Sequence, residues 1–361
     1  MKIALVLGSF SIGTRPLDFE HLYDSPRGLT GTDLCFIRLG EELRKLGNEV
    51  EMIHNVNRLN IDESFDAVIS INEPNLLIGI SPKIKRILYM MLNDFSFVQP
   101  GFNEWTDLYI GVCQQHSDYV EKQYPETKGK WATVPLGCDP ELYKDERVSG
   151  RVVWCSSADR GLHWLLQQWP EIKAAVPEAS LRIMYHFNYG AMDQIEAGSI
   201  SPQGGPYHHH IQEMAQRIRY MKDAIKKLKD LGVEHVGSVS REQMVKEWNE
   251  ASVFAFSTDT VAFSEGFSVS TLEGHASFTV PVLTSCDCLG GIYKDSGCSM
   301  IEAPVQDHLK EFTDAVIRGL KDKEHADAVI AKCRDFAANH TWKQCAYKIN
   351  KLVDISTNIK E

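Results

Sequence analysis

Two glutamates, Glu265 and Glu273, stand on either side of a Gly-Phe-Ser turn and a short apolar run. They follow directly on residues 251–257, which we expect to form a buried strand. If a helix begins near Phe267, Glu265 lies in the loop before the helix and Glu273 lies one to two turns along it. The rise of an α-helix then separates the two carboxylates by about 10 Å. This distance is too long for a pair that shares one proton, but it suits carboxylates that hold two parts of one long ligand.

The turn between the two glutamates could bind an anion. The backbone N–H groups of Gly266, Phe267 and Ser268 would lie at the N-terminus of the expected helix, where backbone donors and the helix dipole favour negative charge. On spacing alone, the alternative is a surface helix that carries two unrelated glutamates. The surrounding chain distinguishes between these two alternatives.

Length and composition exclude several classes of protein. The chain has 361 residues, which is enough for two domains, and its 43% hydrophobic and 24% charged residues are typical of a soluble globular protein. A net charge of −11 argues against broad nucleic-acid binding. The nine cysteines form no CxxC pair, which favours reduced thiols in a cytoplasmic enzyme over a disulfide framework or a zinc site.

The N-terminus carries no pattern of a targeting segment. The apolar run Ile3–Leu7 is short and indicates a first strand rather than a signal peptide. No segment approaches the roughly 20 apolar residues of a membrane span. We therefore expect a cytoplasmic protein without a transmembrane segment, although peripheral contact with a membrane stays open.

Short apolar runs alternate with helical stretches through both halves of the chain. They occur at 3–7, 49–54, 67–71, 87–91, 108–112 and 132–135, and again at 152–155, 181–185, 251–257 and 280–283. The stretch 233–240 gives a further strand, followed by a glycine turn and the N-cap of a helix. This alternation predicts parallel sheets flanked by helices. The polar, turn-rich segment 144–150 lies between the two sets and predicts an interdomain linker.

A predicted helix follows the turn at Gly31 and Thr32. Its apolar positions have helical spacing, as expected for an amphipathic helix: Phe36, Leu39, Leu43 and Leu46. Further along, the segment 93–105 is rich in aromatic residues, including Phe102 and Trp105. Such residues suit either stacking on a sugar or lipid or packing in the core.

The block of Glu, seven residues and Glu, followed by the predicted strand Thr279–Val282, resembles the signature of retaining glycosyltransferases of the GT-B fold, family 4 type. The resemblance implies an α/β protein of two Rossmann-like domains with a cleft between them. Residues 1–145 would form the acceptor domain, onto which the C-terminal helix 342–361 packs back. Residues 150–340 would form the domain that binds a nucleotide-sugar.

The resemblance also implies roles for residues of the second domain. Glu265 would lie at the transferred sugar and reaction centre, and Glu273 would hold the ribose of the donor. Arg160, in the Arg-Gly pair after the strand 152–155, would neutralise the donor diphosphate. The family's other cation has no counterpart here, so either the hydroxyls of Ser156 and Ser157 replace it or the diphosphate is held more weakly. Gly237 would line the nucleotide base.

Two positions of the first domain match the family less closely. Gly31 and Thr32 resemble the loop that approaches the donor, but without the family's adjacent glycine pair. Asn93 and Asp94 follow a predicted strand, where relatives carry a polar pair that faces the transferred sugar. The alternative for Asn93 and Asp94 is an Asx turn.

The expected activity is transfer of a sugar from a nucleotide-sugar, most simply a UDP- or GDP-sugar, to a hydroxyl of a glycan, lipid or other acceptor, with retention of configuration. We expect no cofactor beyond the donor and no metal, since the chain has no Asp-x-Asp motif. The run His208–His210 cannot chelate one ion from one helix face. The alternatives are a GT-B epimerase of nucleotide-sugars and a GT-B protein that binds such a ligand without turnover. A nicotinamide dehydrogenase is disfavoured because the glycine fingerprint is absent.

Overall fold

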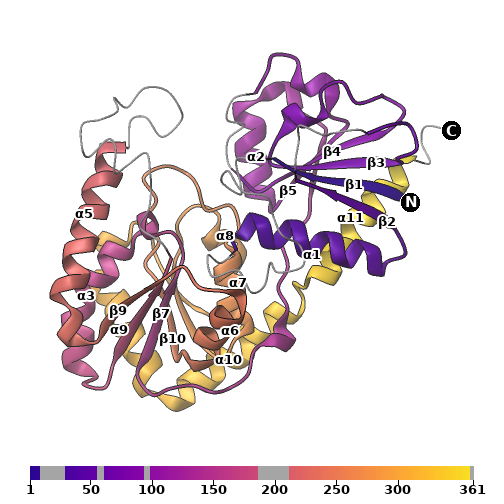
Figure 1. The fold of residues 1–361 in the computed structure, drawn as a ribbon. Helices are drawn as coiled ribbons and strands as arrows, with labels where there is room; N and C mark the ends of the chain where they lie inside the picture. Colours follow the sequence, from indigo (N-terminus) through magenta and orange to yellow (C-terminus); the bar gives the residue numbers. More distant parts are fainter. Residues whose placement is uncertain (9–28, 55–60, 93–97, 186–210, 358–361) are drawn as a thin grey trace. The chain divides into compact units, whose positions relative to one another are not determined.

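A computed structural model describes residues 1–8, 29–54, 61–92, 98–185 and 211–357 of the chain. These residues form two compact units, each built on one six-stranded sheet (Figure 1). One unit comprises the described residues up to Cys138 together with those from Asn339 on, and the other comprises the described residues of Asp139–Ala338. None of the helices formed by the described residues has the length and hydrophobicity that a membrane span requires.

The first unit contains a parallel sheet with the strand order β2-β1-β3-β4-β5-β6. The strands are β1 Lys2–Leu7, β2 Glu49–Ile53, β3 Ala67–Ile71, β4 Lys85–Met90, β5 Leu108–Gly111 and β6 Trp131–Thr133. The helices are α1 Gly31–Lys45, α2 Gln114–Gln123 and α11 Trp342–Thr357. Every residue of β3 is buried, as expected for a central strand of a sheet that is covered on both faces.

Helix α1 begins at Gly31, so Gly31 and Thr32 lie in its first turn rather than in a turn that precedes it. The Thr30 hydroxyl accepts a hydrogen bond from the Asp33 N–H at 3.2 Å, and the Asp33 carboxylate accepts one from the Thr30 N–H at 3.0 Å. This capping box satisfies two donors at the start of the helix. Phe36, Leu39 and Leu43 are fully buried, which confirms the predicted apolar stripe, whereas Leu46 caps the helix and is partly exposed.

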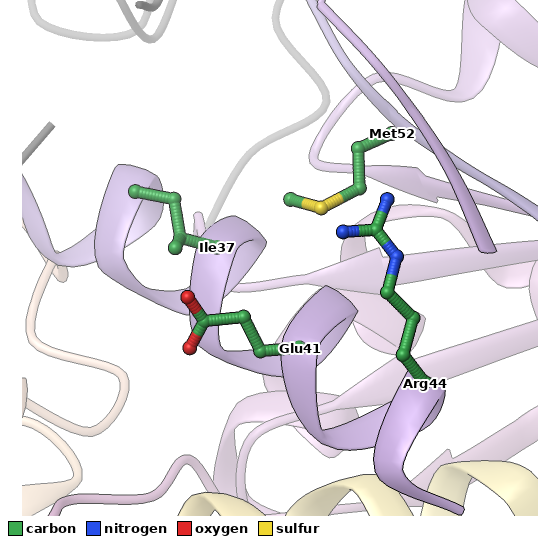
Figure 2. A pocket seen from close by; sticks show the side chains of 4 residues that line it. All are labelled: Ile37, Glu41, Arg44 and Met52. Carbon is green, nitrogen blue, oxygen red and sulfur yellow. The ribbon is translucent and has the colours of Figure 1, made fainter. Parts of the chain in front are cut away.

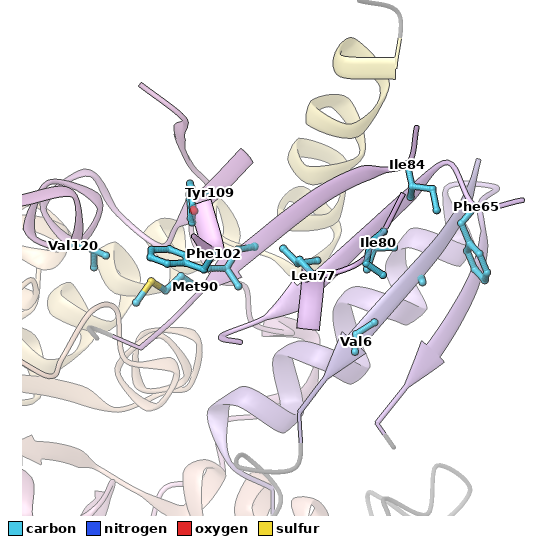
Figure 3. Close-up of a cluster of buried hydrophobic side chains, with 12 residues drawn as sticks. Val6, Phe65, Leu77, Ile80, Ile84, Met90, Phe102, Tyr109 and Val120 are labelled. Atoms are coloured by element: carbon cyan, nitrogen blue, oxygen red, sulfur yellow. The ribbon is translucent and has the colours of Figure 1, made fainter. Parts of the chain in front are cut away.

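A cluster of twelve buried apolar side chains fills the first unit on one side of its sheet (Figure 3). Phe102 is 3% exposed in this cluster and packs edge-on against Tyr109, with ring centroids 6.4 Å apart. Of the two roles expected for the aromatic residues of 93–105, Phe102 therefore takes the one in the core.

The last helix of the chain, α11, belongs to the first unit and packs along α1 (Figure 1). The Asn48 amide donates to Asn350 at 2.8 Å, which ties the end of α1 to α11. Gly137 permits the chain to approach α11 closely, because a Cβ atom at this position would lie 2.3 Å from the backbone nitrogen of Trp342. Larger side chains at position 137 would force these segments apart.

The second unit contains a parallel sheet with the strand order β12-β11-β10-β7-β8-β9. The strands are β7 Arg151–Cys155, β8 Ser180–Met184, β9 Val233–Gly237, β10 Val253–Phe256, β11 Val280–Thr284 and β12 Ser299–Ile301. The helices are α3 Leu162–Ala175, α5 Ile211–Lys227, α6 Arg241–Glu250, α7 Val269–Ala276, α8 Leu289–Tyr293, α9 Leu309–Lys321 and α10 Lys323–Ala338. Of these strands, β12 was not expected from the sequence.

The two halves of the second sheet meet at β7 and β10. The chain proceeds from β7 through β8 to β9 in one direction, and from β10 through β11 to β12 in the other. β7 and β10 are direct neighbours, with Val152 opposite Val253. In open parallel sheets this reversal of strand order leaves a crevice at the carboxyl ends of the two strands, and ligands bind there. A ligand site is therefore expected in the loops that follow β7 and β10.

Candidate functional site

Arg160 and Glu265 form an ion pair between the loops after β7 and β10. Arg160 ends the short 3₁₀-helix Ala158–Arg160, and Glu265 lies in the loop between β10 and α7. Arg160 Nη1 lies 2.8 Å from Glu265 Oε1 and also bonds the Ser264 hydroxyl. The two residues expected to carry the chemistry, far apart in the sequence, are thus in direct contact at the carboxyl end of the sheet.

The Glu265 carboxyl lies in a buried and acidic environment. Only 8% of the residue is exposed. Burial raises the pKa of Glu265 above its usual value, and the charges of Asp287 and Asp159 raise it further, whereas the Arg160 guanidinium and a hydrogen bond from the Ser268 side chain oppose this rise. Arg160 is therefore the group that favours the ionised form of this carboxyl most strongly.

Gly161 permits the close approach of the loops after β7 and β10. It adopts φ +111°, and a Cβ atom on it would lie 2.0 Å from the carbonyl oxygen of Ser257. The Asp259 N–H also donates to the Arg160 carbonyl at 2.9 Å. Only glycine can combine this backbone conformation with this contact, which explains the Arg-Gly pair in physical terms.

Asp287, in the loop after β11, holds the segment that presents Glu265. One oxygen of its carboxylate, Oδ2, accepts hydrogen bonds from the Ser264 N–H, the Glu265 N–H and the Thr260 hydroxyl, each at 2.9 Å. Asp287 itself adopts φ +51°, a left-handed conformation that aspartate tolerates better than most residues. The carboxylate thus acts as a fixed acceptor around which the loop after β10 is arranged.

Helix α7 begins at Val269, two residues later than predicted. Ser268 is its N-cap, and the Ser268 hydroxyl accepts from the Thr271 N–H at 3.2 Å. The prediction of a start near Phe267 was wrong because a serine side chain that can cap the helix ends the loop more effectively than an apolar residue. Gly266 and Phe267 are buried in the loop before this cap.

Ser268 has an unusual backbone conformation for a residue with a side chain, φ +64° and ψ 98°. The described residues contain two other non-glycine residues with positive φ, Asn72 and Asp287. All three lie in loops that follow parallel strands: β3, β10 and β11. Strained backbone of this kind is concentrated at functional sites, and here it follows the carboxyl ends of parallel strands.

Glu273 is paired with a second arginine, Arg241, which is the first residue of α6. Arg241 Nη1 lies 2.6 Å from Glu273 Oε1, and the residues are 8% and 4% exposed. Arg241 Nη2 donates to the Tyr143 hydroxyl at 3.1 Å. Burial lowers the pKa of Arg241, but the charge of Glu273 and the interactions with Tyr143 together outweigh it, so the pKa is raised and the guanidinium stays charged. The two glutamates of the block therefore belong to two separate ion pairs.

Asp259, after β10, is surrounded by donors. Its carboxylate accepts from the Trp164 indole at 2.7 Å and lies 3.1 Å from Arg217 Nη2 and 3.8 Å from the His163 ring. Burial lowers the pKa of His163 to about 4, and the charge of Arg217 adds to this, so the imidazole is neutral at pH 7. Arg217 also bonds Glu213, so its charge is balanced within this group.

The other residues expected at the site lie in several places. Ser157 precedes the 3₁₀-helix of Arg160 and its hydroxyl bonds Asp159, so it shares the loop with Arg160. Gly237 ends β9 with φ +83° and has open space where a side chain would be. Gly31 and Thr32 form the first turn of α1 in the other unit. Asn93 and Asp94, like the run His208–His210, lie outside the described residues.

Three or more metal-ligating side chains come together nowhere in the described part of the chain. A hollow of about 240 Å³ lies beside α1 in the first unit, and Figure 2 shows its lining by Ile37, Glu41, Arg44 and Met52. Its charged groups are engaged already, since Arg44 donates twice to the Val50 carbonyl and Glu41 pairs with Arg38. We assign no ligand to this hollow.

Three residues of the site were not expected from the sequence. Arg241 follows the capping Ser240 and has the pattern of a solvated residue at a helix start. Asp287 stands in Cys-Asp-Cys, where only the cysteines attract notice, and Asp259 lies in a polar loop. Aspartate beside a turn and arginine in a first helical turn are common on protein surfaces, so no local signal distinguishes these three.

The fold has known counterparts among solved structures. Sucrose-phosphate synthase from Thermosynechococcus elongatus superposes with a TM-score of 0.66 over 99% of each chain at 12% identity. A glycosyltransferase involved in avilamycin A biosynthesis gives 0.64 over 99% of this chain and 98% of that chain at 14% identity. The pneumococcal O-GlcNAc transferase, solved in complex with UDP and GlcNAc, gives 0.55 over 83% of this chain and 58% of its own at 14% identity.

The sequence itself matches no protein-family model and no curated protein. At these identities the structural likeness establishes the fold alone. The two parallel six-stranded sheets with flanking helices are those of the GT-B fold, which confirms the predicted fold class of two Rossmann-like domains.

Proposed function

We propose that this protein is a retaining glycosyltransferase that moves a sugar from a nucleotide-sugar, with a UDP- or GDP-sugar as donor, to a hydroxyl of a glycan, lipid or other acceptor. The observation that carries the proposal is the contact between Arg160 and Glu265 at the switch point of a GT-B sheet. With Glu273 in the next helix, the second unit combines a cation with two carboxylates. A nucleotide-sugar needs both, since it carries an anionic diphosphate and many hydroxyl groups.

In this proposal Arg160 stabilises the diphosphate as it leaves. A guanidinium has five N–H donors in a planar fork, so it can bind a carboxylate and a phosphate oxygen at the same time. The pair with Glu265 then orients the guanidinium before the donor arrives. Such preorganised charge is the largest source of catalysis when negative charge develops on a leaving group. Backbone N–H groups near Gly266 would share this role.

The two glutamates would act on different hydroxyl groups. Glu265 would accept hydrogen bonds from the transferred sugar and orient it, and Glu273 would accept hydrogen bonds from the ribose. A retaining transfer of this kind needs no protein nucleophile when the leaving diphosphate is stabilised. We expect turnover without a metal, so EDTA should leave the rate unchanged, and a loss of activity restored by Mn²⁺ would refute this part of the proposal.

A thermal-shift panel tests the donor site first. UDP-, GDP-, ADP- and TDP-sugars are added to the whole protein, and we expect a shift of the melting temperature with one nucleotide class. Glu273→Gln should lower the affinity for that nucleotide about 10- to 100-fold, since a hydrogen bond to a charged group contributes about 1.5–3 kcal/mol. Glu247→Gln is the matched control, because Glu247 is also buried and paired with an arginine, Arg182.

Two outcomes would overturn the donor site: no shift with any nucleotide class, or equal losses in Glu273→Gln and Glu247→Gln. With the donor identified, product analysis separates the remaining functions. Release of free sugar or transfer to an acceptor, with the anomeric configuration read by NMR, supports a retaining transferase. A new nucleotide-sugar formed from the donor alone would indicate an epimerase, and binding without any product would indicate a non-catalytic protein. The UDP complex of the pneumococcal transferase favours UDP as the first nucleotide to assay.

A further inference from the structure

The Arg241–Glu273 pair is buried more deeply than the Arg160–Glu265 pair. The side chains of Arg241 and Glu273 are 8% and 5% exposed, against 22% and 10% for Arg160 and Glu265. The distance of 2.6 Å between Arg241 Nη1 and Glu273 Oε1 is that of a close ion pair. A guanidinium thus occupies one oxygen of the carboxylate that the proposed function assigns to the ribose.

Tyr143 fixes the other end of this guanidinium. Its hydroxyl accepts from Arg241 Nη2 at 3.1 Å, and Tyr143 is itself 4% exposed. Arg241 is therefore held at two nitrogens by two residues from different segments, one before β7 and one in α7. A planar guanidinium with two fixed nitrogens has little freedom to rotate, so its ion pair with Glu273 also restricts the position of the carboxylate.

Stability alone does not account for this arrangement. A buried ion pair seldom stabilises a protein more than a well-packed apolar pair of similar size, because both charges lose their hydration. Such a pair does, however, hold a carboxylate in one rotamer inside a protein. A carboxylate with one oxygen held by a guanidinium still has a second oxygen that can accept hydrogen bonds from the hydroxyl groups of a ligand.

We infer that Arg241 is a positioning residue for ribose recognition: held by Tyr143, it orients Glu273 so that the carboxylate accepts hydrogen bonds from the ribose of a nucleotide. The inference rests on the proposed function, since it takes Glu273 as the group that contacts the ribose. It defines the ligand class more narrowly, as a ribonucleotide in preference to its deoxy form. Arg241 itself does not contact the nucleotide.

The test is the preference for ribose over deoxyribose. Affinities for UDP, GDP and ADP identify the nucleotide that the wild-type protein prefers, and the 2′-deoxy and 3′-deoxy forms of that nucleotide are then measured. We expect the wild type to bind the ribonucleotide at least about 10-fold more tightly than one of the deoxy forms. Arg241→Met should reduce the ratio of the two affinities to about one, mainly by weakening the binding of the ribonucleotide.

Further variants separate positioning from folding. Tyr143→Phe removes one hydrogen bond and no charge, so it should lower the ratio partly while the protein stays folded. Arg182→Met removes the guanidinium of another arginine pair in the same unit, where Arg182 bonds Glu247 at 2.7 and 3.0 Å. It should lower the melting temperature and leave the ratio unchanged. A merely structural Arg241 would behave like Arg182.

The outcomes also distinguish this inference from the proposed function. If Glu273→Gln keeps the wild-type preference for ribose, the role of Glu273 in the proposed function is wrong. If Glu273→Gln abolishes the preference but Arg241→Met and Tyr143→Phe keep it, the inference on Arg241 alone is wrong. Tighter binding of the ribonucleotide by Arg241→Met would also overturn it, because the guanidinium would then compete with the ribose for Glu273.

Discussion

Replacing Asp287 by alanine should loosen the loop that presents Glu265, because one oxygen of Asp287 accepts three hydrogen bonds from that loop. The change removes the acceptor for the Ser264 and Glu265 N–H groups together. It also removes a negative charge that raises the pKa of Glu265, so this pKa should fall. The variant therefore affects both the position and the protonation of the proposed catalytic carboxylate.

The expected loss follows from the contacts. A hydrogen bond to a charged group contributes about 1.5–3 kcal/mol, and bonds that share one acceptor are not additive, so we assign about 2–4 kcal/mol to the three. Alanine at φ +51° costs about 1 kcal/mol more than aspartate. Asp287→Ala should thus lower the free energy of unfolding by about 3–5 kcal/mol. Asp287→Asn keeps an acceptor and tolerates the conformation, so its loss should be about 1–2 kcal/mol.

Urea unfolding of the two variants, with affinity for the donor nucleotide in parallel, measures these effects. Asp287→Gly is the backbone control, because glycine lacks both the carboxylate and the strain. It should lie between Asp287→Ala and Asp287→Asn in stability but bind the nucleotide as poorly as Asp287→Ala. Equal stabilities of Asp287→Ala and the wild type within about 1 kcal/mol, with unchanged affinity, would refute this account of the loop.

Three further perturbations probe the same unit. The pKa of His163 is lowered to about 4, so between pH 6.5 and 4 the unfolded chain binds a proton that the folded protein does not bind. The free energy of unfolding should therefore fall by up to about 3 kcal/mol over this range. His163→Phe should make the free energy of unfolding less dependent on pH between about 6.5 and 4, and an unchanged pH dependence would contradict the role of His163. Gly161→Ala should cost several kcal/mol, since its Cβ would lie 2.0 Å from the Ser257 carbonyl oxygen, and a melting temperature equal to the wild type's would exclude that contact. Asp159→Asn removes a negative charge 3.7 Å from Arg160, a charge that would repel the donor diphosphate. Calorimetry should therefore show that the variant binds the donor nucleotide several-fold more tightly. Weaker binding would mean that Asp159 helps to hold the ligand.

The sequence by itself determined the class of fold and most strands of both sheets. The central strands are short apolar runs buried on both faces, such as β3, and this signal is local. The apolar stripe of α1 was predictable for the same reason, because its spacing follows from the helix alone. The start of α7 was misplaced by two residues, since the cap depends on which side chain reaches the backbone at Thr271.

The pairing of the charged residues was decided only by the tertiary structure. Strand order places β7 beside β10, and this adjacency brings Arg160 to Glu265, although nothing in their local sequence links them. The contact between Arg241 and Glu273 likewise depends on how α6 and α7 lie in the folded unit. Burial determines which of these charged side chains lose their hydration, and a buried charged side chain requires a partner of opposite charge. Burial and long-range contact are properties of the packed sheet, so local patterns cannot contain them.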